Sequence, residues 1–269
     1  MNKVILVLCD GLRYDTAVAN MGFLGHLVET KQASLFQVRG ELPSLSRPMY
    51  ETIHTGLPAC VHGILSNRIV RRSNQPNIFQ LARQAGLVTA AAAYSWFSEL
   101  YNHAPYDRVD DREVDDPALT IQHGRFYTED DTPDPEVFAA GAMLVKRFFS
   151  DYMLVHPMGM DLLGERYGGN SKEYRNHAIQ QDGILAMLVP AWNALGYTLL
   201  VTSDHGMSED GVHGGTTPEV RELPLFILPA NGQGLGYTNK TVSQLQLAPT
   251  ILKLLGVAPP ATMSHQPIE

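Results

Sequence analysis

The chain has 269 residues, 44% of them hydrophobic, which is enough to bury the core of one large α/β domain or two small ones. Its formal net charge is -8, from 28 acidic and 20 basic side chains, and no cluster of Lys and Arg occurs. Because nucleic acids are bound mainly through clustered basic side chains, a nucleic-acid polymer is not expected as a partner.

The amino-terminal segment MNKVILVLCDG contains only a short apolar run. Such a run is too brief for the apolar region of a signal peptide or for a membrane-spanning helix. We therefore expect a cytoplasmic protein without membrane association. The two cysteines, Cys9 and Cys60, are too few for a disulfide framework, and both are expected to be buried thiols.

Five short apolar runs recur between helical patterns and are predicted to be strands. They are apolar on both faces, which is typical of a parallel sheet covered by helices. The fold class is therefore α/β, with a mostly parallel central sheet, helices on both faces and a single domain over 1–269. The runs are VILVL (4–8), VTAAAAY (88–94), YMLVH (152–156), YTLLVT (197–202) and PLFIL (224–228).

Four helices are predicted from their start and stop signals. Two prolines inside the last two patterns predict kinks or early ends there. The helices run from an Asn77 cap to Gly86, from an Asp134 cap through VFAAGAMLVKRFF, from about Asn170 with Glu173 in a capping box to Gly196, and through SQLQLAPTILKLLG to Gly256; the prolines are Pro190 and Pro249.

The segment from about 96 to 131 mixes aromatic and acidic residues with little periodicity. We interpret it as an insertion over the active site, because long loops in compact domains often carry function. The alternative is a long surface excursion without a role in substrate binding.

The motif TSDHG places Asp204 and His205 directly after the apolar strand 197–202, and Asp10 follows the strand 4–8. The carboxyl ends of parallel strands meet at one edge of the sheet, where α/β proteins place their sites. These three side chains are therefore predicted to meet and to bind a metal ion. Alone, the Asp-His pair is equally compatible with a structural role, and Asp10 with a turn or helix cap.

Ser46 precedes Pro48 and a predicted helix. A serine at this place has its oxygen at the positive end of the helix dipole, where backbone N–H groups can receive a phosphate-like anion. The alternative is that Ser46, or Ser44, is a simple helix cap.

Two further segments supply metal-binding residue types: Asp161 and Glu165 in HPMGMDLLGERYG, and His213 in DGVHGG. With the three residues after the other strands they form a set of oxygen and nitrogen ligands. Such a set suits two divalent metal ions about 4 Å apart, one holding the nucleophile and the other activating water or stabilising the leaving oxygen.

In this order the motifs resemble the nucleotide pyrophosphatase/phosphodiesterase branch of the alkaline phosphatase superfamily, from Asp10 to about Gly256. The matching positions are Asp10-Gly11, Ser46 with Pro48, Thr55-Gly56, His62-Gly63-Ile64, Asn67, Asp161 with Gly164, Ser203 to Gly206, and His213. The resemblance implies an alkaline phosphatase-like fold in which Ser46 is a catalytic nucleophile that forms a phospho-serine. It also implies that the amide of Asn67, 21 residues after Ser46, steadies the transition-state oxygen.

The resemblance implies that Asp10, Asp204 and His205, together with Ser46, hold one metal ion, and that Asp161 and His213 hold the other. Glu165 stands where the family usually has a histidine, so this second site departs from the pattern. Zn is expected, with Mn, Mg or Fe possible at the Glu165 site because carboxylates are harder ligands. The alternative is that Glu165 points away and the second site is weak or empty.

We therefore expect a metal-dependent hydrolase of phosphate esters, a phosphodiesterase or nucleotide pyrophosphatase acting on a small phosphate ester or nucleotide. One alternative is phosphonate or phosphomonoester hydrolysis on the same site. Another is a non-catalytic metal- or ligand-binding module. Sulfate esters are not expected, because sulfatases of the same superfamily have an arginine four residues after their nucleophile, and this chain has Tyr50 at that place. The sequence does not indicate an oligomeric state.

Overall fold

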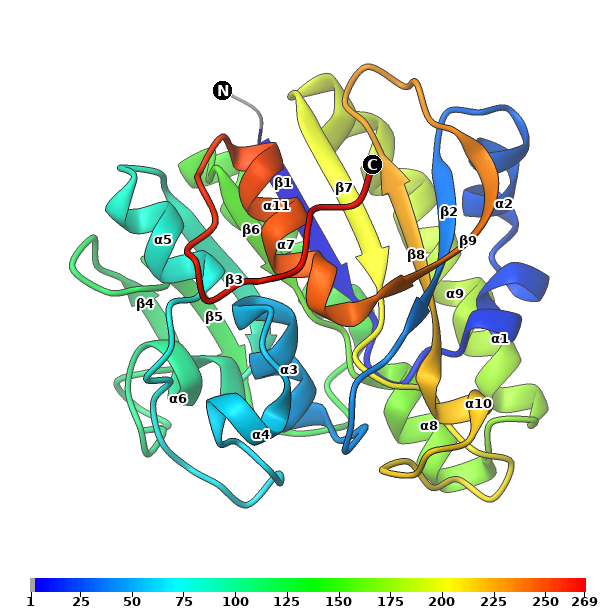
Figure 1. Ribbon diagram of the computed structural model, residues 1–269, viewed down its shortest axis with the longest axis horizontal. Helices are drawn as coiled ribbons and strands as arrows, with labels where there is room; N and C mark the ends of the chain where they lie inside the picture. The colour runs from blue at the N-terminus through cyan, green and yellow to red at the C-terminus, as the bar shows by residue number, and fades with distance from the viewer. Residues whose placement is uncertain (1–2) are drawn as a thin grey trace.

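The computed structural model describes residues 3–269, which form one nine-stranded sheet with helices packed against it (Figure 1). In order across the sheet, the strands are β4 (Glu113–Asp115), β5 (His123–Tyr127), β3 (Thr89–Tyr94), β6 (Tyr152–Val155), β1 (Lys3–Leu8), β7 (Tyr197–Thr202), β8 (Glu222–Leu228), β2 (Ser34–Arg39) and β9 (Gly236–Ser243). The five predicted strands correspond to β1, β3, β6, β7 and β8.

The centre of the sheet is parallel, as predicted. β1 pairs in parallel with β6 and β7, and β3 pairs in parallel with β5 and β6. β8 departs from this pattern, because it runs antiparallel to both β7 and β2. At one edge β4 is antiparallel to β5, and at the other β9 is parallel to β2.

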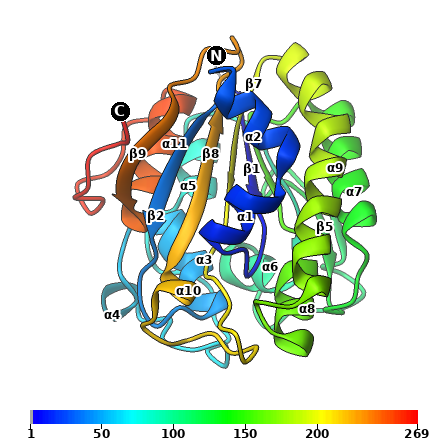
Figure 2. The same cartoon turned by 90° about the vertical axis from the view of Figure 1, so that its right-hand side faces the viewer.

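Helices cover both faces of the sheet (Figure 2). Alternate residues of β1 explain this arrangement, since Val4 and Leu6 belong to one buried core and Ile5 and Val7 to the other. One face carries α3 (Ser46–Thr55), α4 (Ala59–His62), α5 (Ile78–Gln84), α6 (Trp96–Tyr101), η1 (Gln244–Gln246) and α11 (Leu247–Leu255); the other carries α1 (Tyr14–Asn20), α2 (Gly22–Glu29), α7 (Asp134–Phe148), α8 (Gly159–Tyr167) and α9 (Lys172–Ala194), with α10 (Pro218–Arg221) before β8.

The structure confirms one of the predicted helix caps and contradicts two others. The Asn77 cap is confirmed, because its side chain accepts from the Gln80 N–H. The Asp134 cap is wrong: α7 is preceded by Pro133, and the Asp134 side chain instead accepts hydrogen bonds from outside the helix. The predicted capping box of α9 is also wrong, since Ser171 rather than Asn170 caps that helix.

The two helix prolines do not shorten their helices. α9 continues through Pro190 to Ala194, so the missing N–H costs the helix its bond to the Ala186 carbonyl but does not end it. Pro249 lies in the first turn of α11, where backbone N–H groups have no partner within the helix.

The segment 96–131 is more regular than its sequence indicated, because it contains α6, β4 and β5 and extends the sheet at one edge. Its proposed position over the active site stays a prediction, as does the single-domain assignment. Cys9 is buried as expected, but Cys60 is exposed, because it lies on the short surface helix α4. Within residues 3–269, no helix combines the length and apolar character needed to cross a membrane.

Strand register brings three carboxyl ends to the same level. Leu8 of β1 pairs with Thr202 of β7, and Val7 pairs with Val155 of β6. The loops that follow these three strands therefore leave the sheet side by side, and they carry most of the predicted ligands.

Candidate metal centre

Asp10, Asp204 and His205 form what we call the first ligand cluster. Each offers a ligand atom, and these atoms all lie within 4.8 Å of one another. His205 Nε2 is 3.3 Å from Asp10 Oδ1 and 3.3 Å from Asp204 Oδ2, and all three side chains are buried. The three residues lie just beyond the aligned ends of β1 and β7, so the geometry follows from the strand register.

The turn after Asp10 requires glycine. Gly11 has a φ of +77°, and a Cβ built on it would lie 2.9 Å from the Asp161 Cα. Its N–H donates to Asp204 Oδ1 at 3.2 Å. Gly11 thus lets the β1 loop approach Asp161 closely while it orients Asp204.

His205 is prepared to act as a neutral ligand. Its Nδ1 lies 3.0 Å from the Gly206 carbonyl oxygen, so Nδ1–H donates there and the Nε2 lone pair faces the carboxylates. Burial lowers the pKa of His205 to about 4. The ring is therefore neutral at neutral pH, which is the form that binds metal ions.

Asp161, His205 and His213 form the second ligand cluster, whose ligand atoms also lie within 4.8 Å of one another. The His205 and His213 rings stack with centroids 4.0 Å apart. His213 Nδ1 lies 3.2 Å from the Ser44 carbonyl, which directs Nε2 toward Asp161 Oδ1 at 3.7 Å. The two clusters therefore share His205, a feature that the sequence did not indicate.

Glu165 lies at the rim of the second cluster. Asp161 and Glu165 are four residues apart in α8, so they project from the same face of that helix. Glu165 Oε1 lies 3.3 Å from His213 Nε2, and its side chain is 54% exposed. Hydrogen bonding to His213 lowers the pKa of Glu165. The carboxylate thus points toward the cluster rather than away from it.

The buried atoms of the two clusters fit divalent metal ions. Within residues 3–269, Asp10 Oδ1, Asp161 Oδ1 and Asp204 Oδ2 are buried and have no hydrogen-bond donor. Burial, followed by the charge of Asp10, raises the pKa of both Asp161 and Asp204 well above the ordinary value. Buried carboxylates held this close need a cation or protons to offset their charge, and hard oxygen ligands favour a divalent metal ion.

Ser46 is the first residue of α3, and its Oγ lies 3.1 Å from His205 Nε2. The cap residue is Leu45, and the Ser46 side chain makes no capping hydrogen bond, so the interpretation as a simple helix cap is wrong. Ser44 does not cap the helix either, because its hydroxyl donates to the Glu41 carbonyl. Ser46 thus faces the first ligand cluster.

A hydrogen bond from the residue after Ser46 holds the Asn67 side chain near the predicted nucleophile. The Arg47 N–H donates to Asn67 Oδ1 at 3.0 Å. The backbone N–H groups at the start of this helix were expected to receive a phosphate-like anion. The Arg47 N–H instead holds the Asn67 side chain, and Pro48 has no N–H that could take its place. Within residues 3–269, no acceptor meets the Asn67 amide nitrogen, which leaves it available to a ligand near Ser46.

Two residues at Asp10 were not among the predicted site residues. Tyr50 donates its hydroxyl hydrogen to Asp10 Oδ2, and His156 Nε2 lies 3.1 Å from the same oxygen. Burial works to raise the pKa of Asp10, but hydrogen bonding to His156 and the proximity of His205 hold it at about 2. The sequence signal that could have identified Tyr50 is its position four residues after Ser46, which puts both side chains on one face of the helix.

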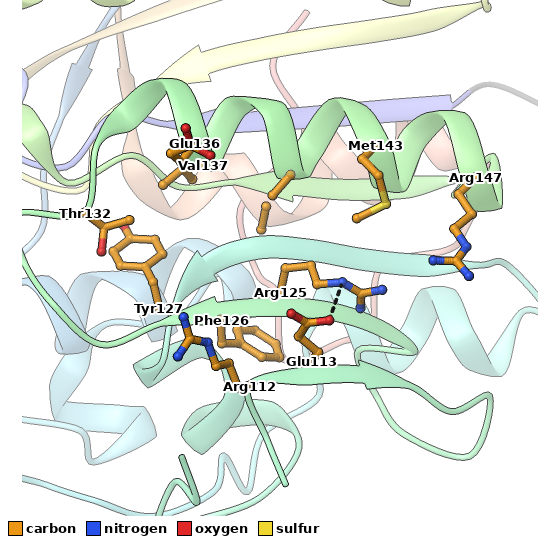
Figure 3. A pocket seen from close by; sticks show the side chains of 12 residues that line it. Arg112, Glu113, Arg125, Phe126, Tyr127, Thr132, Glu136, Val137, Met143 and Arg147 are labelled. Carbon is orange, nitrogen blue, oxygen red and sulfur yellow. Dashed lines mark ion pairs between the residues drawn. The ribbon is translucent and has the colours of Figure 1, made fainter. Parts of the chain in front are cut away.

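A cavity of about 540 Å³ lies between α7 and β5 (Figure 3). Arg112, Arg125 and Arg147 line it together with Phe126 and Tyr127, and Arg125 pairs with Glu113 at 3.7 Å. None of the predicted site residues lines this cavity. This cavity is therefore distinct from the candidate metal site.

Comparisons with known proteins place the chain in a family. Residues 4–210 match the family model described as type I phosphodiesterase / nucleotide pyrophosphatase. Among curated proteins, the catalytic subunit of human GPI ethanolamine phosphate transferase 2 is 26% identical over 96% of this chain. GPI ethanolamine phosphate transferase 3 of Eremothecium gossypii is 30% identical over 44% of it. The chain covers only 27% and 13% of these two longer proteins.

Two solved structures share the fold. Murine ectonucleotide pyrophosphatase/phosphodiesterase 5, in complex with AMP, has a TM-score of 0.72 and 15% identity, covering 97% of this chain and 96% of that one. The phosphonate monoester hydrolase of Silicibacter pomeroyi has a TM-score of 0.68 and 15% identity, covering 100% of this chain and 76% of that one. The chain therefore belongs to the type I phosphodiesterase / nucleotide pyrophosphatase family.

Proposed function

We propose that the chain is a metal-dependent phosphodiesterase that cleaves small phosphate diesters through a covalent phospho-Ser46. One observation carries this proposal: Ser46 Oγ lies 3.1 Å from His205 Nε2, at the amino end of α3. Neighbouring Asp10 Oδ1 and Asp204 Oδ2 are buried without a hydrogen-bond donor. A hydroxyl at the edge of a cluster of ligand atoms suits a nucleophile better than a structural serine.

The first ligand cluster and Ser46 would hold one divalent ion, and Asp161, His213 and Glu165 the other. When bound, such ions neutralise charge on the phosphoryl oxygens and lower the pKa of a coordinated hydroxyl or water. Zn is proposed for the first site. Mn, Mg or Fe are the alternatives at the Glu165 site, because its ligands include two carboxylates.

In the first chemical step, Ser46 Oγ forms a bond to phosphorus as the bond to one ester oxygen breaks. The hydroxyl proton is lost from Ser46, and the departing alkoxide is released as the alcohol after taking up a proton. Water then cleaves the phospho-serine, which releases a phosphate monoester and restores the Ser46 hydroxyl. The Asn67 amide nitrogen and the positive end of the α3 dipole would stabilise negative charge on the phosphoryl oxygens.

A second candidate is transfer of the phosphoryl group to an alcohol instead of water. The names of the curated relatives favour it, because they describe transferases of ethanolamine phosphate. Both reactions share the phospho-serine step and differ only in the acceptor that releases Ser46. Hydrolysis of phosphomonoesters or phosphonates on the same site remains a third reaction that the same experiment distinguishes.

The test compares turnover of bis-p-nitrophenyl phosphate, p-nitrophenyl phosphate and a phosphonate monoester with added Zn, Mn or Mg. The native chain is expected to prefer the diester, and Ser46→Ala is expected to lose at least about 10³-fold in kcat. Adding a small alcohol during turnover shows whether it competes with water as acceptor. Mass spectrometry after acid quenching of turnover with bis-p-nitrophenyl phosphate is expected to find a p-nitrophenyl phosphoryl group on Ser46.

Ser44→Ala is the matched control, because it removes a nearby hydroxyl that donates to the Glu41 carbonyl. This variant is expected to retain turnover. Equal activity of the Ser46→Ala variant and the native chain would sink the covalent route. Absence of turnover of every ester under all three metals would instead favour a binding module.

A further inference from the structure

The two carboxylates of the first ligand cluster share one pattern: a hydrogen-bond donor holds one oxygen of each, and the other oxygen has no donor. Asp10 Oδ2 accepts from the Tyr50 hydroxyl and lies 3.1 Å from His156 Nε2. Asp204 Oδ1 accepts from the Gly11 N–H at 3.2 Å. Within residues 3–269, Asp10 Oδ1 and Asp204 Oδ2 are buried and have no donor. Each carboxylate therefore has one oxygen available to a metal ion.

These two available oxygens lie next to the same nitrogen atom. Each is 3.3 Å from His205 Nε2, and Ser46 Oγ is 3.1 Å from that nitrogen. One nitrogen and three oxygens are thus gathered as possible ligand atoms. Four ligands of this kind suit tetrahedral Zn, whereas Mn and Mg favour six oxygen ligands. The number of oxygens that the carboxylates offer therefore bears on which metal ion the cluster prefers.

The Tyr50 hydroxyl is held firmly in its place beside Asp10. The Tyr50 side chain is buried, and its ring stacks on the Phe97 ring with centroids 4.4 Å apart. The His156 ring meets it edge-on, with centroids 4.9 Å apart. Tyr50 lies four residues after Ser46 in α3, so both side chains project from one face of that helix. The packing of α3 thus sets the position of this hydroxyl together with that of Ser46.

We propose that Tyr50 is a positioning residue that restricts Asp10 to one metal-binding oxygen, and that it thereby favours Zn over six-coordinate ions such as Mn at the first ligand cluster. A carboxylate with two available oxygens can bind a metal ion through both, which raises the number of ligand atoms. The Tyr50 hydroxyl engages the second oxygen of Asp10 instead. This inference rests on the proposed function, because it concerns the metal ion that the first ligand cluster would hold.

The experiment measures the affinity of the native chain and of Tyr50→Phe for the first equivalent of Zn and of Mn, by competition with a chromogenic chelator. Tyr50→Phe removes only the hydroxyl, since the ring can keep its packing against Phe97. Zn is expected to bind this variant about 10–100-fold more weakly. Because the released Asp10 oxygen becomes an additional ligand for Mn, the ratio of Zn affinity to Mn affinity is expected to fall by at least about tenfold.

His156→Leu is a second variant at the same carboxylate oxygen, because it removes the other group that contacts Asp10 Oδ2. It is expected to lower the ratio of Zn affinity to Mn affinity in the same direction. A higher ratio in this variant would contradict the proposal, because contacts at Oδ2 would then not favour Zn.

Tyr197→Phe is the matched control. Tyr197 is also buried, and its hydroxyl donates to the Ser150 carbonyl at 2.7 Å, at the opposite end of β7 from Asp204. This variant is expected to keep the native ratio. Equal weakening of Zn and Mn by Tyr50→Phe would overturn the proposal, because the hydroxyl would then only support the fold. Native affinities for both ions in Tyr50→Phe would overturn it as well.

The metal titration separates this inference from the proposed function. A lower ratio in Tyr50→Phe, without turnover of any ester by the native chain, would refute the phosphodiesterase function and leave the role of Tyr50 standing. Turnover by the native chain with an unchanged ratio in Tyr50→Phe would do the reverse. A native chain that binds neither ion would also overturn the role of Tyr50.

Discussion

Glu51 gives the clearest test of the energetics of α3, the helix that begins at Ser46. The side chain is buried, Tyr101 donates a hydrogen bond to its Oε2 at 3.0 Å, and Ser73 donates to its Oε1. Burial raises the pKa of Glu51 from 4.5 to about 7, although these two hydrogen bonds and the charge of Arg71 act in the opposite direction. Below about pH 7 the folded chain therefore prefers the protonated acid.

This raised pKa makes stability depend on pH in a defined direction. Between pH 4.5 and about pH 7, the folded state keeps a proton on Glu51 that the unfolded state has released. Stability therefore falls as the pH rises through this window, by about 1.4 kcal/mol per pH unit and about 3 kcal/mol in all. Above the window the full penalty for the buried carboxylate is present.

Glu51→Gln removes the ionisation and keeps the size of the side chain. The free energy of unfolding of this variant, minus that of the native chain, is expected to rise by about 3 kcal/mol as the pH increases from about 4.5 to about 8. Urea unfolding of both proteins over this range measures the difference, and Glu29→Gln, at an exposed position of α2, is the control. Parallel pH profiles for native and Glu51→Gln proteins would refute the argument.

Two further variants test the second ligand cluster and the helix that carries it. Glu165→Ala is expected to weaken binding of the second equivalent of divalent metal while the first is retained, as measured by titration calorimetry; loss of both equivalents would contradict the assignment of Glu165 to the second site alone. Gly159→Ala is expected to lower the free energy of unfolding by about 1–3 kcal/mol, because the new Cβ would lie 2.1 Å from His177 Nε2 and 2.8 Å from Asp134 Oδ2. Gly183→Ala, whose Cβ meets nothing within 4 Å, is the control; equal urea midpoints for the two variants would refute the steric argument.

The side chains around Gly159 also explain why Asp134 is not a helix cap. Its Oδ1 accepts from the Gly159 N–H at 3.1 Å, and its Oδ2 lies 2.7 Å from both His177 Nε2 and Gln181 Nε2. Gly159 begins α8, the helix that carries Asp161. Asp134 thus fixes the start of the helix that presents a candidate metal ligand, and this use outweighs capping of its own helix.

The sequence alone determined the parts of this protein that depend on local order. Apolar runs predict β1, β3, β6, β7 and β8, because strands buried on both faces show no alternation. The residues after β1 and β7 form the first ligand cluster, because parallel strand ends meet at one edge. The position of Ser46 before Pro48 likewise predicts a helix start near these ends.

The remaining strands could not be predicted from the sequence, because they lie toward the edges of the sheet. β4 has three residues, and β9 has only one buried residue, so neither shows the continuous apolar run of a central strand. Their pairing with β5 and β2 decides that these residues are strands at all. The same holds for the segment 96–131, whose low periodicity conceals α6, β4 and β5.

Only the tertiary structure decided how the side chains of the candidate site meet. His205 belongs to both ligand clusters because the loop between β7 and α10 folds back, so that the His213 ring stacks on the His205 ring eight residues before it. Tyr50 and His156 converge on one oxygen of Asp10 from α3 and from the end of β6. Residue types and spacing specify which chemistry is available, but the distances between these atoms depend on the packing of elements far apart in the chain.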